Sequence, residues 1–245
     1  MRSDVGLLVM KELRQMSRSR RALLSALLVP TFMLVILPAI QLRASSSGRS
    51  TAIPHGAPVG LSALGGPKTN VFLYFVFPLL YVLAGLMTPS VAAIYTIINE
   101  RERRTLELLM ALPVTVRQIL AAKLIANLIG AVAPMLPLFL VNAALVLTVG
   151  RGTPAYLLAA LVLLLSALAS TVGLGLFLAL VVRDYRSAQS LTYVWILPAM
   201  LLVGAADVLV PGLWRFYALA AVLLLLLVAL LAFCLKWLTF ERYLA

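Results

Sequence analysis

Long uncharged stretches alternate with short clusters of charge along most of the 245-residue chain. About 18 or more consecutive apolar residues without charge are enough to cross a bilayer as a helix. Six gaps between successive charges meet this criterion without being rich in turn-forming residues. They predict transmembrane spans at about 22–42, 71–98, 118–149, 155–182, 190–206 and 216–236. The pattern therefore predicts an all-α integral membrane protein with six transmembrane helices.

The composition agrees with a membrane protein and limits its chemistry. The chain is 63% hydrophobic and only 11% charged, whereas soluble domains are about 45 to 50% apolar and about 25% charged. A single cysteine, Cys234, excludes a disulfide framework within the chain, and a single histidine, His55, argues against a histidine-based metal site. We therefore expect no metal and no cofactor on this chain.

The distribution of basic residues predicts the orientation of the spans. With six spans, 15 of the 20 lysines and arginines fall on the side that carries both termini, and 5 fall on the other side. The positive-inside rule then places both termini in the cytoplasm of a multi-pass protein in the plasma (inner) membrane. Topology and contact with anionic lipid headgroups explain the basic excess, so we expect no nucleic-acid partner.

The six spans together form a transmembrane domain at 22–245. Two further helices are expected, one before the first span and one between the second and third spans. Residues 1–21 place apolar side chains at helical spacing and predict an amphipathic interfacial helix. This helix would either anchor the chain or form an elbow that also contacts a cytoplasmic partner. Charges four apart, such as Glu100 with Arg104, predict a second short amphipathic helix at about 100–112. This helix ends before Pro113, and a capping box of Thr115 and Gln118 starts the next one.

The helix at 100–112 carries an apolar stripe that includes Leu106, Leu109 and Met110. A connector between spans has no need to present these side chains beside water, whereas a helix that docks onto a partner does. A helix that lies on the membrane surface is the competing interpretation. The pattern favours docking without excluding a connector.

The run from Glu100 to Lys123 resembles the segment between the second and third spans of type-2 ABC exporter permeases, the membrane subunits of ATP-driven efflux pumps. The resemblance rests on Glu100, Glu102, the core Thr105 to Leu109, the turn Leu112 to Thr115, and Lys123. Weaker similarities lie near the N-terminus, around Gln189 and Pro198, and at Phe240 to Arg242. The chain departs from many such permeases in having only 28 residues at 43–70, where they carry a large external domain.

The resemblance implies a cognate ABC ATPase that binds ATP and Mg, and a second permease copy or a homologous permease in a homo- or heterodimer. The chain itself has no G-x-x-x-x-G-K-[ST] loop. The helix at 100–112 would be the cytoplasmic coupling helix. Its ATPase-docking residues would be Glu100, Glu102, Arg104, Thr105, Leu106, Glu107, Leu109, Met110 and Pro113.

Polar residues in the spans are the remaining functional candidates. Asp207 is predicted to be either a helix N-cap at the external interface or, as the resemblance implies, part of an external gate. Hydrogen bonds between helices are expected from Asn127, Asn142, Ser166, Ser170, Thr171 and Gln189. Because Asp207 is the only acid clear of the cytoplasmic segments, a catalytic carboxylate pair cannot form in the membrane. A stand-alone channel or secondary carrier, without an ATPase, is the alternative function.

Overall fold

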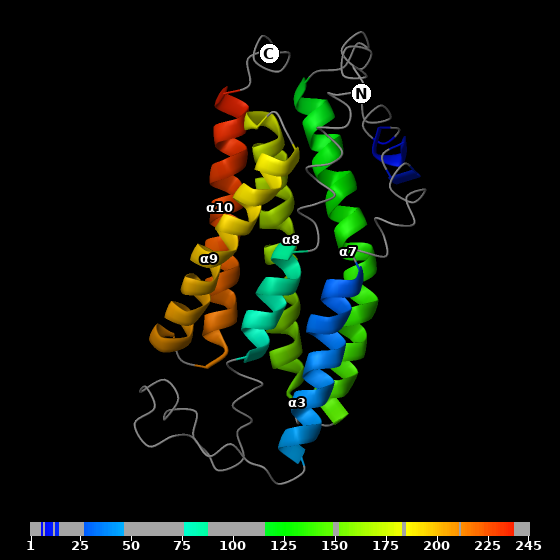
Figure 1. Cartoon of the computed structure of the whole chain (residues 1–245), viewed down its shortest axis with the longest axis vertical. Coiled ribbons are helices and arrows are strands. Elements are labelled where there is room, and N and C mark those ends of the chain that lie inside the picture. Colours follow the sequence, from blue (N-terminus) through cyan, green and yellow to red (C-terminus); the bar gives the residue numbers. More distant parts are fainter. Residues whose placement is uncertain are drawn as a thin grey trace.

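The computed structural model describes residues 6, 8–11, 13–14, 27–46, 76–87, 116–148, 152–182, 185–210 and 212–237. Every regular element in these residues is helical (Figure 1). The labelled elements are η1 (Phe32–Ile36), α3 (Leu37–Ser46), α7 (Val116–Thr148), α8 (Pro154–Val181), α9 (Tyr185–Leu209) and α10 (Trp214–Trp237). A shorter apolar helix, Phe77–Met87, carries no label. The helical residues 27–31 run directly into η1 and α3, and we call 27–46 the first helix.

Within the described part of the chain, four helices are long and apolar enough to cross a membrane. The qualifying segments are Gln118–Thr148, Pro154–Ala179, Arg186–Ala206 and Trp214–Phe233. They confirm the expected all-α, multi-pass membrane protein. The first two predicted spans correspond to the shorter apolar helices Leu27–Arg43 and Phe77–Met87, and the remainder of 22–42 and 71–98 lies outside the described residues. The predicted coupling helix at 100–112 and most of the predicted interfacial helix at 1–21 also lie outside them.

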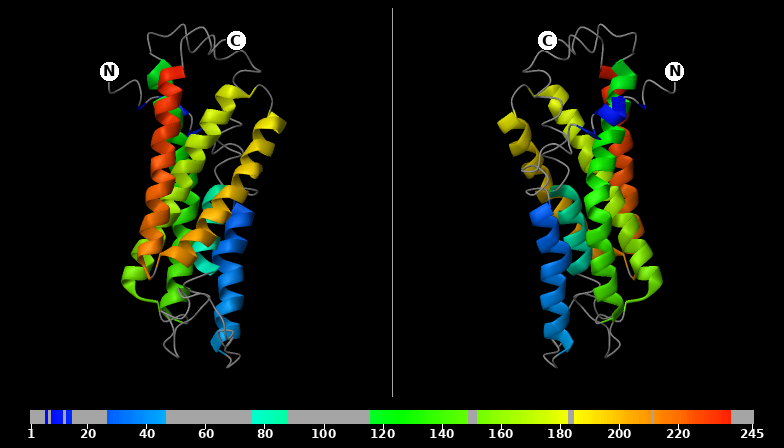
Figure 2. Two further views of the ribbon diagram at one scale, coloured as in Figure 1. Left: turned by 90° about the vertical axis from the view of Figure 1, so that its left-hand side faces the viewer. Right: turned by 90° about the vertical axis from the view of Figure 1, so that its right-hand side faces the viewer.

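Successive long helices run in alternating directions (Figure 1 and Figure 2). α7 begins at one end of the bundle, where α8 ends and α9 begins, and where α10 also ends. We call this the Val116 end. The opposite Thr148 end carries the starts of α8 and α10 and the ends of α3, α7 and α9. This up-and-down arrangement is the one expected of consecutive spans joined by short turns.

α8 is the central helix of the bundle. In its membrane-crossing window 67% of the residues are buried, against 28%, 24% and 22% in α7, α9 and α10. α8 contacts all three of these helices, and its contact with α10 is the most extensive. Its buried face is rich in alanine, including Ala159, Ala160 and Ala167. Small side chains let membrane helices approach closely, which explains how one helix can be covered by several neighbours.

Local sequence signals set the ends of the helices at the Thr148 end. α8 starts with Pro154 in its first turn, and the Thr153 hydroxyl accepts a hydrogen bond from the Tyr156 amide at 3.3 Å. This is the usual capping arrangement for a helix N-terminus. Between α9 and α10 the chain turns at Gly212, which has φ 66°. That left-handed conformation is easy for glycine and strained for other residues.

Asp207 does not cap a helix N-terminus, so that interpretation is wrong. α9 continues through residue 207 to Leu209, and α10 starts only at Trp214. The helix ends shortly before Pro211 because a residue that precedes a proline is disfavoured from the helical region. Asp207 therefore occupies the last turn of α9 at the Thr148 end. Its side chain lies outside the described residues, and a role at an external gate stays a prediction.

Candidate functional site

Polar side chains buried among the described helices are the first candidates for function, because polar groups are costly inside a membrane. Eight such residues are buried: Lys123, Asn127, Asn142, Ser166, Ser170, Thr171, Thr192 and Arg215. They differ in where their hydrogen bonds go. That difference separates residues that serve their own helix from residues that join helices together.

The buried hydroxyl groups bond locally. Each donates to a backbone carbonyl three or four residues earlier in its own helix: Ser166 to Leu163 at 2.7 Å, Ser170 to Ala167 at 2.9 Å, Thr171 to Ala167 at 2.7 Å and Thr192 to Ala188 at 3.0 Å. The hydrogen bonds between helices expected of Ser166, Ser170 and Thr171 are therefore not the ones these donors make. A short hydroxyl side chain reaches its own preceding turn more easily than a neighbouring helix.

Asn142 joins three helices. It lies in α7 and has an exposed fraction of 0%. Its Nδ2 donates to the carbonyl oxygen of Leu34 in η1 at 2.6 Å, and its Oδ1 accepts a hydrogen bond from the Tyr81 hydroxyl at 2.6 Å. Tyr81 belongs to the Phe77–Met87 helix. For Asn142 the predicted role in joining helices is confirmed.

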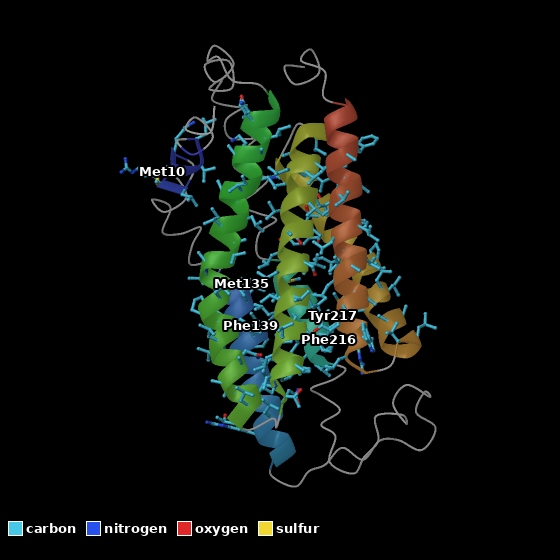
Figure 3. The ribbon with its side chains drawn as sticks, turned by 180° about the vertical axis from the view of Figure 1, so that it is seen from behind. Met10, Met135, Phe139, Phe216 and Tyr217 are labelled. Carbon is cyan, nitrogen blue, oxygen red and sulfur yellow. The ribbon has the colours of Figure 1, made fainter. Side chains whose placement is uncertain are left out.

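Aromatic rings pack against Tyr81, the partner of this amide, and extend the contacts to α8 and α10. The ring of Tyr81 lies edge-on to Phe77, with centroids 6.3 Å apart, and is tilted against Phe139 of α7 at 6.0 Å. The Tyr81 side chain is also hydrogen-bonded to Tyr156 of α8. Tyr156 in turn packs edge-on against Phe216 of α10, with centroids 5.3 Å apart. Figure 3 shows Phe139 on α7 and Phe216 on α10.

Leu34, Tyr81, Asn142 and Tyr156 together define a polar network in the half of the bundle nearer the Thr148 end. It contains hydrogen-bond donors and acceptors and no carboxyl, amino, guanidinium or imidazole group. Such a network can orient helices or a neutral polar group, and it does not contain the ligand types that usually hold a metal ion. Among the described residues, no group of three or more His, Cys, Asp or Glu side chains is placed to hold a metal ion.

Two basic side chains are buried near opposite ends of the bundle. Lys123 lies two turns into α7 from the Val116 end, and its carbonyl accepts a hydrogen bond from Asn127 Nδ2 at 2.9 Å. Arg215 lies in the first turn of α10, where its Nε donates to the Gly212 carbonyl at 2.9 Å. In the sequence Arg215 directly precedes the predicted span 216–236, and it is one of the 5 basic residues expected on the external side. The structure instead buries it at the start of a helix, where it holds the turn at Gly212.

The remaining predicted site residues belong to the segment before α7 and to α9. All nine docking residues between Glu100 and Pro113 lie outside the described part of the chain, as does the side chain of Gln189. α7 begins at Val116, next to the predicted cap Thr115, which itself lies outside the described residues. The docking surface therefore stays a prediction.

The long apolar helices define a multi-pass integral membrane protein. A family model described as ABC-2 family transporter protein matches residues 40–226. This match covers well over half of the chain, from the first helix to the middle of α10, and the chain belongs to this family. The protein is thus a membrane subunit, or permease, of an ABC transporter. No curated protein matches the chain.

Proposed function

We propose that the chain is the permease subunit of an ABC exporter that couples ATP hydrolysis by a separate ATPase subunit to movement of a substrate across the membrane. The observation that carries this proposal is the family match at 40–226. That range contains most of the four long apolar helices and the whole segment predicted to dock onto an ATPase.

The energy source would lie on the partner. The sequence lacks the glycine-rich loop, followed by lysine and a hydroxyl residue, that cradles nucleotide phosphates. ATP and Mg would therefore bind to the cognate ATPase, and this chain would carry neither nucleotide nor cofactor. Its contribution would be to convert closure of the ATPase into rigid-body rocking of the spans.

We further propose six spans in the plasma (inner) membrane with both termini in the cytoplasm. The alternating directions of α7 to α10 support this topology, as does the excess of basic residues on one side. The Val116 end would be cytoplasmic and the Thr148 end external. Asp207, in the last turn of α9, would then lie at the external end, where a gate residue is expected.

Two such permeases, either identical or homologous, would form the transport path between them. α7, α9 and α10 each present exposed apolar side chains, such as Leu140, Leu201 and Leu225. These faces would contact lipid or the second permease. Both are apolar surroundings, so these helices can leave most of their surface uncovered within one subunit.

The coupling helix at 100–112 provides the test of this function. Leu109 lies at the centre of its predicted apolar stripe, and burying a leucine contributes about 1.5 to 3 kcal/mol. In the proposed complex Leu109 inserts into an apolar cleft of the ATPase. Leu109→Asp loses the contribution of the leucine and also buries an unpaired charge in that cleft, which adds several kcal/mol to the free-energy cost of docking. We expect the variant to reach the membrane normally, to lose co-purification of the ATPase, and to lose ATP-dependent transport in proteoliposomes.

The matched control is Leu145→Ala in α7. Leu145 packs against the core, so its truncation should lower stability while the ATPase stays bound. If Leu109→Asp binds the ATPase and transports at the native rate, the segment is a connector or a membrane-surface helix, and docking at 100–112 is refuted. Transport by the purified chain without any ATPase would instead establish the channel or carrier alternative.

A further inference from the structure

The first helix is interrupted by proline. Pro30 and Pro38 flank the π-helical segment η1, in which the Leu37 amide donates to the Phe32 carbonyl, five residues earlier. The Thr31 hydroxyl donates to the Leu27 carbonyl at 2.7 Å in the same region. Proline has no backbone N–H, so each proline inside a helix leaves a carbonyl of the preceding turn without its usual donor.

Pro38 follows the junction between η1 and α3 and lacks the amide hydrogen that both helical registers need there. Five residues before it, in the π-helical register, lies the carbonyl of Met33, and four residues before it, in the α-helical register that resumes in α3, lies the carbonyl of Leu34. Leu34 is almost fully buried, so water does not replace the donor. Asn142 Nδ2 approaches this carbonyl to 2.6 Å from α7. A side chain 108 positions later in the chain therefore supplies the hydrogen bond that Pro38 cannot make.

Asn142 is itself held in place. Its Oδ1 accepts from the Tyr81 hydroxyl, and the Tyr81 ring is packed between Phe77 and Phe139. Rotating the amide out of this position would break two hydrogen bonds at once in a site sealed from water. A buried amide whose oxygen and nitrogen are both hydrogen-bonded to other helices favours one arrangement of those helices.

We propose that Asn142 is a positioning residue that replaces the donor missing at Pro38 and thereby fixes the proline-interrupted first helix to α7 as one moving unit. The bond to Tyr81 adds the Phe77–Met87 helix to the same unit. The motion of this unit during transport rests on the proposed function, whereas the replacement of the Pro38 donor does not. The first helix then follows α7 whenever the spans rock.

A double-mutant cycle on the purified permease, in nanodiscs and without any ATPase, tests the replacement. The variants are Asn142→Leu, Pro38→Ala and the two combined, and the readout is the apparent melting temperature. Pro38→Ala restores an amide that can donate to the Leu34 carbonyl. Asn142→Leu should therefore lower the melting temperature by several degrees in the native background and by clearly less in the Pro38→Ala background. Equal decreases in both backgrounds would overturn the proposal.

Tyr81→Phe is the matched control, because it removes the other hydrogen bond of Asn142 and leaves the bond to Leu34 in place. Pro38→Ala should not relieve its effect. Equal relief of Tyr81→Phe and Asn142→Leu would mean that Pro38→Ala stiffens the bundle generally, and the specific assignment would fail. If Asn142→Leu does not accumulate alone, accumulation of the double variant supports the proposal, and failure of both variants refutes it.

The movement of the first helix with α7 needs a functional readout. With the ATPase bound, Asn142→Leu should reduce the amount of substrate transported per ATP hydrolysed, and Pro38→Ala should restore part of that ratio. If the double-mutant cycle shows the expected coupling in melting temperature but the amount of substrate transported per ATP is unchanged, Asn142 only stabilises the fold. Absence of any ATP-dependent transport by the native chain would instead count against the proposed function and leave the stability result intact.

Discussion

Gly85 offers a direct test of the packing between the Phe77–Met87 helix and α8. A Cβ atom built on Gly85 would lie 2.6 Å from the Cβ of Ala167 and 3.3 Å from the backbone nitrogen of Leu168. Both atoms are fixed to the backbone of α8, so no flexible side chain can move aside. Gly85→Ala can be accommodated only if one helix shifts away from the other.

Two opposing effects set the magnitude. Replacing glycine by alanine inside a helix stabilises the fold by about 0.5 to 1 kcal/mol, whereas forcing an extra carbon into a packed interface costs about 1 to 3 kcal/mol. The steric effect is the larger, so Gly85→Ala should lower the free energy of unfolding by about 0.5 to 2 kcal/mol. In a protein of this size that corresponds to a fall of about 1 to 8 °C in melting temperature.

Gly204→Ala is the matched control, because a Cβ at Gly204 in α9 would meet no atom within 4 Å. This variant keeps the helix-propensity gain without the clash and should raise the melting temperature by about 1 to 4 °C. Thermal unfolding of both variants in the same detergent isolates the steric effect. Adding Ala167→Gly to Gly85→Ala removes the nearest contact and should recover part of the loss. If Gly85→Ala stabilises as much as Gly204→Ala does, the close approach of the two helices is refuted.

Two further predictions concern the placement of the chain in the membrane. A reporter fused after Ala245 should be cytoplasmic and one inserted at Gly48 external, and finding both on one side would contradict six spans. Trp214 is 74% exposed in the first turn of α10, and its ring lies 6.2 Å from Tyr217, as expected for aromatic residues at a membrane interface. With the other two tryptophans replaced by phenylalanine, its fluorescence should be quenched more by lipids brominated near the headgroup than near the chain end, and the reverse order would place it in the hydrocarbon core.

Hydropathy alone predicted the long helices well but placed some of their ends too far inward. The predicted span 190–206 lies inside a helix that runs from Tyr185 to Leu209, and the predicted span 216–236 corresponds to a helix that starts at Trp214. The end at 206 and the start at 216 were set by the charged residues Asp207 and Arg215, which the helices themselves contain. A gap between charges measures the uncharged part of a segment, whereas a helix continues for as long as its backbone hydrogen bonds do.

The partners of the buried polar residues were much harder to predict. The sequence indicated that Asn142 would join helices, but not that it would bind a carbonyl 108 residues away and a hydroxyl 61 residues away. Which residues pair over such separations in sequence depends on how whole helices pack, and a periodic pattern carries no information about that packing. One signal was nevertheless present. A proline in a span identifies the carbonyl four residues earlier as a group that needs a donor, and Pro38 identifies Leu34 in this way.

The exposed leucines of α9 and α10 have a different meaning in a membrane than they would have in water. In water, an uncovered apolar face as long as a helix would indicate a protein partner. In a bilayer, lipid tails are as apolar as leucine, so a second permease copy gains little from covering Leu201 or Leu225 that lipid does not already supply. A stable pair of permeases must instead rest on close backbone approach or on hydrogen bonds between helices. Within this subunit, those are the two devices found where Gly85 meets Ala167 and where Asn142 meets Leu34.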